Sequence, residues 1–204
     1  MQRSLLLLLI LLTLLAGCET TPPLPPVTAI DSPAYRERQQ RLGQVVTWSL
    51  QGQVAISHSD GSLNGQLRWQ QQRQALDVAL RDPFGRTKLK VISDGQHASL
   101  TVDDDHYESD DAEALLKDVA DLNLPLSALP GWLRGAAGDE CLLTAEASPA
   151  GEPAMLICDI DGSRWQVTYL SYRQVGNEFL PRKLEINGPD LLLKLAVGRW
   201  NHPL

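Results

Sequence analysis

The sequence predicts a mainly β fold with a helical insertion: a strongly curved antiparallel sheet or incomplete β-barrel of about ten or eleven strands, covered by about three helices. Segments in which apolar and polar residues alternate recur through most of the chain, with Gly, Asp or Pro turns between them. Such segments are typical of antiparallel strands. One stretch with helical spacing interrupts the series after residue 110, and another precedes it. A curved sheet whose helical insertion covers one opening accounts for this order.

The first 17 residues have the pattern of a secretory signal. Arg3 supplies a positive charge, and the apolar run from Leu5 to Leu15 is too short to span a bilayer. Leu15-Ala16-Gly17-Cys18 resembles a bacterial lipobox, which implies cleavage before Cys18 and acyl and diacylglyceryl groups on that cysteine. An ordinary signal peptide that happens to precede a cysteine is the alternative. Glu19 replaces the Asp that retains lipoproteins in the inner membrane, so we expect a lipid anchor in the outer membrane, facing the periplasm.

Residues 18–32 are expected to form the lipidated cysteine and a tether, because four prolines between residues 22 and 26 favour an extended chain. Residues 33–204 then form a single domain. Without the signal, 17 Lys and Arg oppose 25 Asp and Glu, giving a net charge of −8. This balance argues against nucleic acid as a partner and against broad adhesion to anionic lipid. Membrane contact is therefore expected from acyl chains and apolar side chains.

The elements of the domain follow from local patterns. A helix is expected from the Ser32-Pro33 start to Leu42. Asp110–Glu113 resembles a capping box and predicts a second helix. A third, short helix is expected from Leu124 to Gly135, interrupted by Pro130. Strands are expected at residues 47–57, 63–69, 75–80, 87–92, 97–102, 141–146, 154–160, 164–172, 182–186 and 191–197.

The turn from Arg81 to Arg86 joins two of these strands and carries Phe84, one of two phenylalanines in the chain. Pro83 fixes a backbone torsion and Gly85 permits the sharp return. One interpretation is that the Phe84 ring folds back onto the end of the sheet. The other is that Pro83, Phe84 and Gly85 form an exposed loop that inserts into a membrane or contacts a partner.

The helical insertion is more apolar than a solvent-facing plug requires. Its apolar residues either complete a packed core or roof an apolar cavity within the curved sheet. For the second case the candidate lining residues are Trp48, Leu67, Trp69, Leu115, Val119, Leu129, Trp132 and Leu133.

Other side chains that carry chemistry give weaker signals. Cys141 and Cys158 lie symmetrically about a turn, so a disulfide across a hairpin is expected, with two buried thiols as the alternative. The acidic run from Asp103 to Asp111 lacks the spacing of a calcium loop, and a solvated turn followed by a helix cap is expected there, without a metal. The sequence offers no nucleophile and base that predict a hydrolase.

Taken in order, a set of residues resembles the LolB family of outer-membrane lipoprotein receptors, from about Ser32 to Trp200. The set is Ser32-Pro33, Arg36, Gln39-Gln40, Gly52, Trp69-Gln70-Gln71, Pro83, Gly85, Thr87, Asp110–Glu113, Pro125-Leu126, Leu129, Trp132-Leu133, Trp165, Val167 and Tyr169. In that family an aliphatic residue, usually Leu, projects from the turn in which this sequence has Phe84.

The resemblance implies a LolA/LolB-like fold and a receptor, not an enzyme. Such a receptor accepts triacylated lipoproteins from the periplasmic carrier LolA and inserts them into the inner leaflet of the outer membrane. The implied partners are LolA, lipoprotein acyl chains and outer-membrane phospholipid. No cofactor is implied beyond the acyl groups on Cys18, and a monomer is expected. The alternative is a scaffold lipoprotein of the envelope that binds another protein through its surface and has no acyl cavity.

Overall fold

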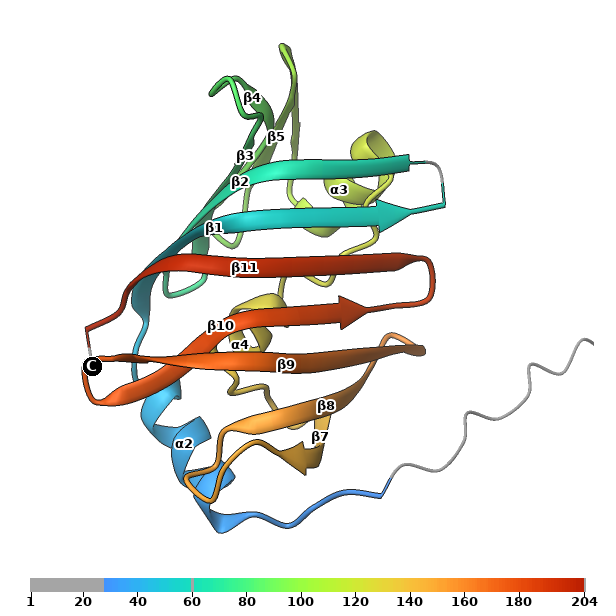
Figure 1. Ribbon diagram of the computed structural model, residues 1–204. Coiled ribbons are helices and arrows are strands. Elements are labelled where there is room, and N and C mark those ends of the chain that lie inside the picture. The colour runs from blue at the N-terminus through green and yellow to red at the C-terminus, as the bar shows by residue number, and fades with distance from the viewer. Residues whose placement is uncertain (1–27, 60, 204) are drawn as a thin grey trace, which may run out of the picture.

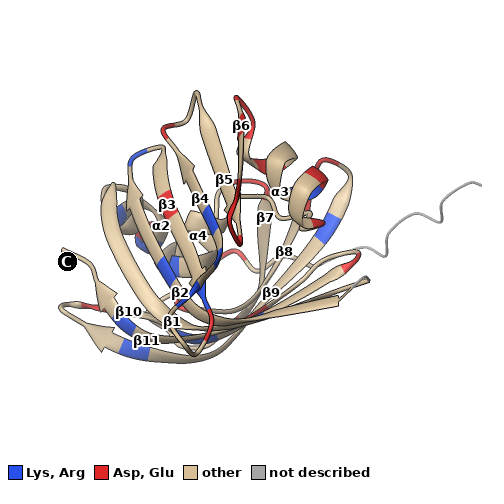
Figure 2. Ribbon diagram, turned by 90° about the horizontal axis from the view of Figure 1, so that it is seen from above, with Lys and Arg blue, Asp and Glu red and all other residues tan. Residues whose placement is uncertain are grey.

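The computed structural model describes residues 28–59 and 61–203, which form one eleven-stranded sheet. Its strand order is β6-β5-β4-β3-β2-β1-β11-β10-β9-β8-β7, and all neighbouring strands are antiparallel. The sheet is not closed, because β6 and β7 are its edges, and it curves around the helices (Figures 1 and 2). The predicted fold class is confirmed. The strands are β1 Thr47–His58, β2 Gly61–Gln72, β3 Ala75–Arg81, β4 Thr87–Ser93, β5 Ala98–Val102, β6 Asp105–Ser109, β7 Cys141–Glu146, β8 Pro153–Ile160, β9 Ser163–Val175, β10 Glu178–Asn187 and β11 Leu191–Asn201.

Two meanders make up the sheet, one from β1 to β6 and one from β7 to β11. They are joined by the pairing of β1 with β11, in which Val54 lies opposite Leu195 and Ile56 opposite Leu193. All four of these side chains are buried. The centre of the sheet is therefore formed by strands from opposite ends of the described chain.

Three helices accompany the sheet: α2 Pro33–Gly43, α3 Ala112–Ala120 and α4 Leu129–Arg134. Ser32 caps α2, since its hydroxyl accepts a hydrogen bond from the Tyr35 amide at 3.1 Å. Asp111 caps α3 in the same way, accepting from the amides of Glu113 and Ala114. The predicted starts of α2 and α3 are thus observed.

The predicted third helix was placed too early. It begins at Leu129, and Pro130 lies in its first turn instead of interrupting it. Proline is tolerated there because the first amides of a helix have no intrahelical acceptor. Residues 126–128 form a turn, and Gly135 ends the helix with a left-handed conformation, φ 71°.

The prediction of a solvated turn between Asp103 and the α3 cap was wrong in one respect, because β6 lies there. The chain turns at Asp103 and Asp104 and then pairs residues 105–109 with β5. No side chain of β6 is buried, so this edge strand has no alternation of apolar and polar residues from which it could be recognised.

The predicted signal peptide, the lipidated Cys18 and most of the tether lie outside the described residues. The end of the tether is described, and there the Ile30 amide donates a hydrogen bond to the Leu143 carbonyl of the edge strand β7 at 2.7 Å. No helix in residues 28–59 and 61–203 has both the length and the apolar character needed to cross a membrane.

Arg38 ties α2 to both the insertion and the second meander. Its side chain is fully buried and donates to the carbonyls of Gly135, Arg134 and Phe179 at 2.7–3.1 Å, and to Glu178 at 3.2 Å. A buried guanidinium is tolerated because these acceptors replace its hydration.

We expect Arg38→Ala to lower the free energy of unfolding by about 3–5 kcal/mol, because it removes the donor of three carbonyls and leaves the buried Glu178 carboxylate with Arg41 as its remaining partner. Arg36→Ala is the matched control on the same helix. Arg36 pairs with Asp31 at the surface, so its loss should change stability by less than about 1 kcal/mol. Urea unfolding followed by tryptophan fluorescence measures both, and equal effects would contradict this role of Arg38.

Candidate functional site

An entirely apolar cavity lies between the sheet and the segment from α3 through α4, residues 112–134, which we call the roof. Its volume is about 60 Å³, and all its lining side chains are aliphatic except one tryptophan. The lining residues are Val54, Ile56, Leu67, Trp69, Val78, Leu80, Leu89, Val91, Leu116, Leu122, Leu124, Leu126, Leu129, Leu133, Leu193 and Leu195. A cavity without a polar group cannot hold water favourably, so this space suits apolar matter alone.

The structure brings together half of the eight candidate lining residues. Leu67, Trp69, Leu129 and Leu133 line the cavity, whereas the other four do not. Leu115 is buried and Val119 half-buried on α3, and Trp48 stacks behind Trp69 with ring centroids 6.2 Å apart. Trp132 is fully buried on the other side of α4, where its ring lies 5.6 Å from that of Trp165.

Sequence reasoning missed most of the remaining lining residues, although the signal was present. Val54, Ile56, Val78, Leu80 and Val91 all occupy buried positions of alternating strands. The alternation places them on the inner face, but the part of that face covered by the roof depends on how α3 and α4 pack. No local sequence pattern predicts how these two helices pack on the sheet.

The two helices of the roof are attached very differently. Arg134 at the end of α4 donates to the carbonyls of Leu42 and Val45, at 2.7 and 2.9 Å, and its guanidinium lies 5.3 Å from the centre of the Trp48 ring. Burial lowers the pKa of Arg134 to about 10. It therefore stays protonated at neutral pH and fixes α4 to the C-terminal end of α2, where the helix dipole favours a cation.

Two polar contacts, each with an exposed or partly exposed carboxylate, link α3 to its surroundings. The Ser127 amide donates to Glu113 at 2.9 Å, and His58 Nδ1 lies 3.4 Å from Asp121 Oδ2. The apolar side of the helix, with Leu115 and Leu116 buried, packs on β4, β5 and β6. Because the Glu113–Ser127 bond is exposed and the Asp121 carboxylate faces water, these contacts hold α3 less firmly than the buried bonds of Arg134 hold α4.

The Phe84 loop projects away from the sheet. The Phe84 side chain is 85% exposed, so it does not fold back onto the end of the sheet. Asp82 organises the loop: it accepts from the amides of Phe84 and Arg86 and from the Arg86 side chain at 2.7–3.0 Å. Burial alone would raise the pKa of Asp82, but these hydrogen bonds outweigh it and lower the pKa. Gly85 adopts φ 85°, which favours glycine.

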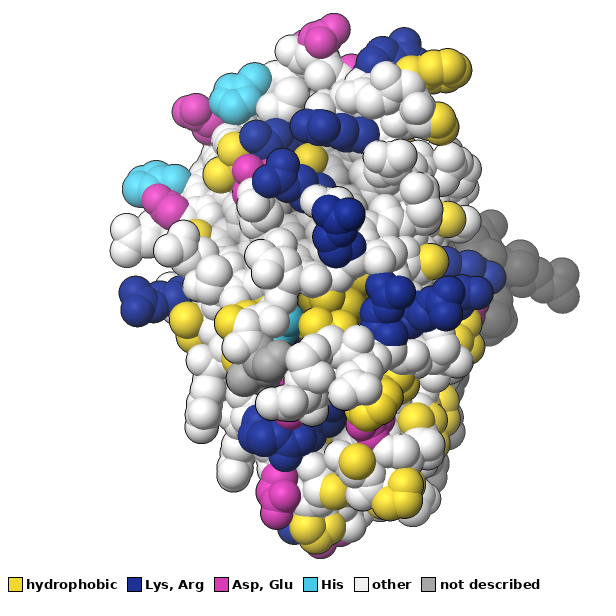
Figure 3. Space-filling view, turned by 60° about the vertical axis from the view of Figure 1, so that its left-hand side comes forward, with side chains coloured by type: hydrophobic (Ala, Val, Ile, Leu, Met, Phe, Trp, Pro, Cys, Tyr) yellow, Lys and Arg dark blue, Asp and Glu magenta, His cyan; other side chains and the backbone are white. Residues whose placement is uncertain are grey.

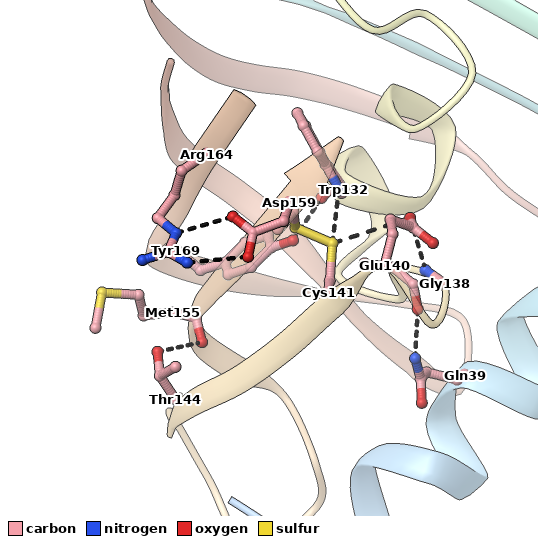
Figure 4. The surroundings of a disulfide bond; sticks show 12 residues. Gln39, Trp132, Gly138, Glu140, Cys141, Thr144, Met155, Asp159, Arg164 and Tyr169 are labelled. Atoms are coloured by element: carbon pink, nitrogen blue, oxygen red, sulfur yellow. Dashed lines mark hydrogen bonds and ion pairs between the residues drawn. A yellow bond between two sulfur atoms is a disulfide. The ribbon is translucent and has the colours of Figure 1, made fainter. Parts of the chain in front are cut away.

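Cys141 and Cys158 lie directly opposite each other in the β7–β8 pair and form a disulfide (Figure 4). The Trp132 indole donates to Cys141 Sγ at 3.2 Å, and the Trp132 carbonyl accepts from the Tyr169 hydroxyl at 2.7 Å. Burial raises the pKa of Tyr169, so the hydroxyl remains a donor. The disulfide therefore joins the edge hairpin next to α4. Within the described part of the chain, no group of three or more His, Cys, Asp or Glu residues is placed to hold a metal ion.

Comparison with known proteins gives consistent matches. The family model described as "Outer membrane lipoprotein LolB" matches residues 46–200. Outer-membrane lipoprotein LolB of Shewanella baltica (strain OS223) is 32% identical over 192 residues, covering 93% of this chain and 85% of that protein. The protein of the same name from Pseudomonas savastanoi pv. phaseolicola (strain 1448A / Race 6) is 30% identical, with coverages of 93% and 92%.

A solved structure shares the fold. It is the crystal structure of a DUF1329 family protein from Desulfovibrio piger, with a TM-score of 0.51 and 8% sequence identity. The match covers 85% of this chain and 95% of that chain. At this identity the likeness concerns the fold alone.

We expect replacement of both Cys141 and Cys158 by Ser to lower the free energy of unfolding by about 3 kcal/mol, because the disulfide closes a loop between residues 17 apart. Thermal or urea unfolding of the oxidised chain measures the change. Reductant should lower the stability of the wild type by a similar amount and leave the double variant unchanged. A wild type that is insensitive to reductant would contradict the prediction.

Proposed function

The chain belongs to the LolB family of outer-membrane lipoproteins, and we propose that it accepts the acyl chains of triacylated lipoproteins from the carrier LolA beneath its roof and inserts them into the inner leaflet of the outer membrane. Family membership makes it an outer-membrane protein of lipoprotein localisation and not an enzyme. The observation that supports the acyl site is the cavity under the roof, whose lining contains no polar side chain.

The physics of the cargo explains why such an interior is needed. Three acyl chains carry on the order of 45 methylenes at ~0.8 kcal/mol each, so their exposure to water costs tens of kcal/mol. The chains must therefore pass from one apolar enclosure to another without a free intermediate. No nucleotide is required for this exchange if each acceptor binds the chains more tightly than the donor does. The proposed function accordingly involves no cofactor.

The cavity has to enlarge before it can hold cargo. Its volume of about 60 Å³ is well below the ~300–1,000 Å³ of ordinary ligand pockets. We infer that α3 and residues 121–126 move away from β4–β6, while Arg134 keeps α4 and the preceding Ser127 in place. The contacts of Glu113 and Asp121, whose carboxylates face water at least in part, are consistent with such a movement.

The anchor and the exposed loop complete the proposal. We propose that Cys18 carries the lipid anchor on the periplasmic side of the outer membrane and that the chain acts as a monomer. Phe84 then inserts among the lipids near the site of release. Burial of its ring contributes only ~1.5–3 kcal/mol, which is too little to anchor a protein but enough to orient it.

The small cavity also favours a second candidate function, that of a scaffold lipoprotein with a filled interior that binds another envelope protein through its surface. The two functions differ in whether an apolar guest enters. Fluorescent fatty acid added to the purified chain should bind under the acyl-transfer proposal and should not bind if the interior stays closed.

We expect Glu113→Ala to speed the uptake of fluorescent fatty acid roughly two- to tenfold, because it removes the hydrogen bond that links α3 to Ser127. Glu108→Ala serves as the matched control, because it removes an exposed carboxylate that lies 3.4 Å from His106 on the same strand, β6. Stopped-flow fluorescence measures both rates. If neither protein takes up the fatty acid, the scaffold function is favoured. If the two variants have equal rates, the movement of α3 is contradicted.

We expect Phe84→Glu to fold and to take up acyl chains normally, but to deliver lipoprotein to liposomes at least about tenfold more slowly, because the apolar contact with lipid is lost. The exposed ring makes no contribution to the core, so stability should change little. Phe84→Leu, which keeps an apolar side chain, should remain active. The measurement is the lipoprotein recovered with floated liposomes after transfer from LolA, and wild-type delivery by Phe84→Glu would count against the loop.

A further inference from the structure

A groove of about 460 Å³ crosses the outer face of the sheet, on the side opposite the roof. It is lined by Gln51, Gly52, Gln53, Gln66, Leu67, Arg68, Arg81, Ala196, Gly198 and Arg199. Three of these ten residues are arginines and none is acidic, although the whole chain has a net charge of −7. Figure 3 shows Lys and Arg side chains gathered on this side of the molecule.

Strand register brings the arginines together. Gln51 on β1 lies opposite Arg68 on β2 and opposite Arg199 on β11, so the two arginines are two strands apart, or about 10 Å. Arg81 lies opposite Gln66, the residue two positions before Arg68. Arg81 and Arg68 are therefore diagonal neighbours, about 7–8 Å apart.

A bulge puts Arg199 on the outer face. The register between β1 and β11 shifts at Gln51 and Gly52, so Gly198 has no partner, and Gly198 and Arg199 are both exposed between the buried Val197 and Trp200. Regular alternation would have turned Arg199 inward with Val197. Glycine is required at position 52, where a Cβ atom would lie 2.5 Å from the Ala196 carbonyl oxygen.

The three guanidinium groups have no counter-charge within the part of the chain that the structure describes. Basic neighbours have carboxylate partners: Lys90 has Asp77 and Lys194 has Glu185, at 3.7 and 3.3 Å. Arg68, Arg81 and Arg199 form no ion pair with the described residues. Like charges at adjacent sheet positions repel, so this arrangement favours an external anion.

We propose that this groove binds the phosphate groups of anionic phospholipids at the membrane surface. Arginine presents paired N–H donors that match phosphate oxygens, and Gln51, Gln53 and Gln66 add amide donors beside them. Arg81 is the last residue of β3 and directly precedes the Asp82–Arg86 loop. The inference therefore rests on the proposed membrane contact of Phe84, and it extends that contact from one apolar side chain to a continuous surface.

The distribution of charge favours this face for the membrane. Acidic residues are concentrated on β6 and α3, while basic residues lie on the strands near the centre of the sheet (Figure 2). An anionic surface would attract the groove and repel the edge that carries β6. An acidic protein surface is a different partner with similar charge, and the experiment below separates the two.

The test is arginine footprinting with phenylglyoxal on the full chain held in nanodiscs. Discs contain either phosphatidylcholine alone or phosphatidylcholine with about a quarter phosphatidylglycerol, and labelling at each arginine is read by mass spectrometry. We expect the anionic discs to slow labelling of Arg68, Arg81 and Arg199 roughly tenfold, since each basic residue near such a surface adds to attraction. Arg36 and Arg73, exposed and outside the groove, should be labelled equally in both discs. High salt should remove the protection.

Equal labelling of the groove arginines in both discs would overturn the proposal. Protection that appears only when LolA is added would also overturn it, in favour of an acidic protein partner. Failure of fatty-acid uptake would refute the acyl-transfer function but would leave this footprint unaffected, so the two failures are distinguishable.

A variant provides the second measurement. Arg68→Gln/Arg81→Gln/Arg199→Gln should lose roughly tenfold in lipoprotein delivery to phosphatidylglycerol-containing liposomes while its fatty-acid uptake stays at the wild-type level. Arg36→Gln/Arg73→Gln/Arg164→Gln removes the same charge outside the groove and the roof and should deliver normally. Equal delivery by the two triple variants would contradict a role for the groove.

Discussion

The apolar inner face of an open sheet has to be kept from water, and the rest of this structure depends on how that is done. The sheet curves but does not close, so β1–β5 present Val, Leu and Trp side chains to an opening between β6 and β7. The roof covers this opening with leucines and leaves an apolar space of about 60 Å³. The leucines of the roof bind the inner face of the sheet through apolar contacts, and an acyl chain can form contacts of the same kind. A cargo of acyl chains can therefore replace the roof without exposing either surface to water.

This exchange requires a cover that is fixed at one end. Arg134 and Arg38 supply the fixed end, because their buried guanidinium groups donate to carbonyls of α2, α4 and β10, and no acyl chain can replace those bonds. The other end, α3, adds to its apolar contacts the polar contacts of Glu113 with Ser127 and of Asp121 with His58, in which the carboxylates are at least partly exposed. Polar and apolar attachment thus have different roles in one segment. The polar network preserves the architecture while the apolar contact is exchanged.

The sequence was informative wherever burial is one-sided and local. Alternation located ten strands, and Ser32 and Asp111 located the starts of two helices. Sequence-based prediction failed for β6, because both faces of that strand are exposed. It also failed at Pro130, because a proline can either interrupt a helix or occupy its first turn. Half of the candidate lining residues were found, because an inward direction follows from alternation while position under the roof follows from tertiary packing. Arg199 illustrates a further limit. The bulge at Gly198 places the Arg199 side chain on the outer face of the sheet, and this position cannot be predicted from the number of charged residues in the sequence.

Net charge and local charge consequently lead to different expectations for this protein. A mature chain with a net charge of −8 is repelled as a whole by an anionic membrane, so broad adhesion is disfavoured at a distance. Within about a Debye length, ~8–10 Å, only the nearest charges matter, and these are determined by which face approaches. If the face with Arg68, Arg81 and Arg199 approaches, attraction is local and the repulsion from β6 and α3 is screened. The negative net charge then improves the function, because it selects one orientation and brings the Phe84 loop to the lipid.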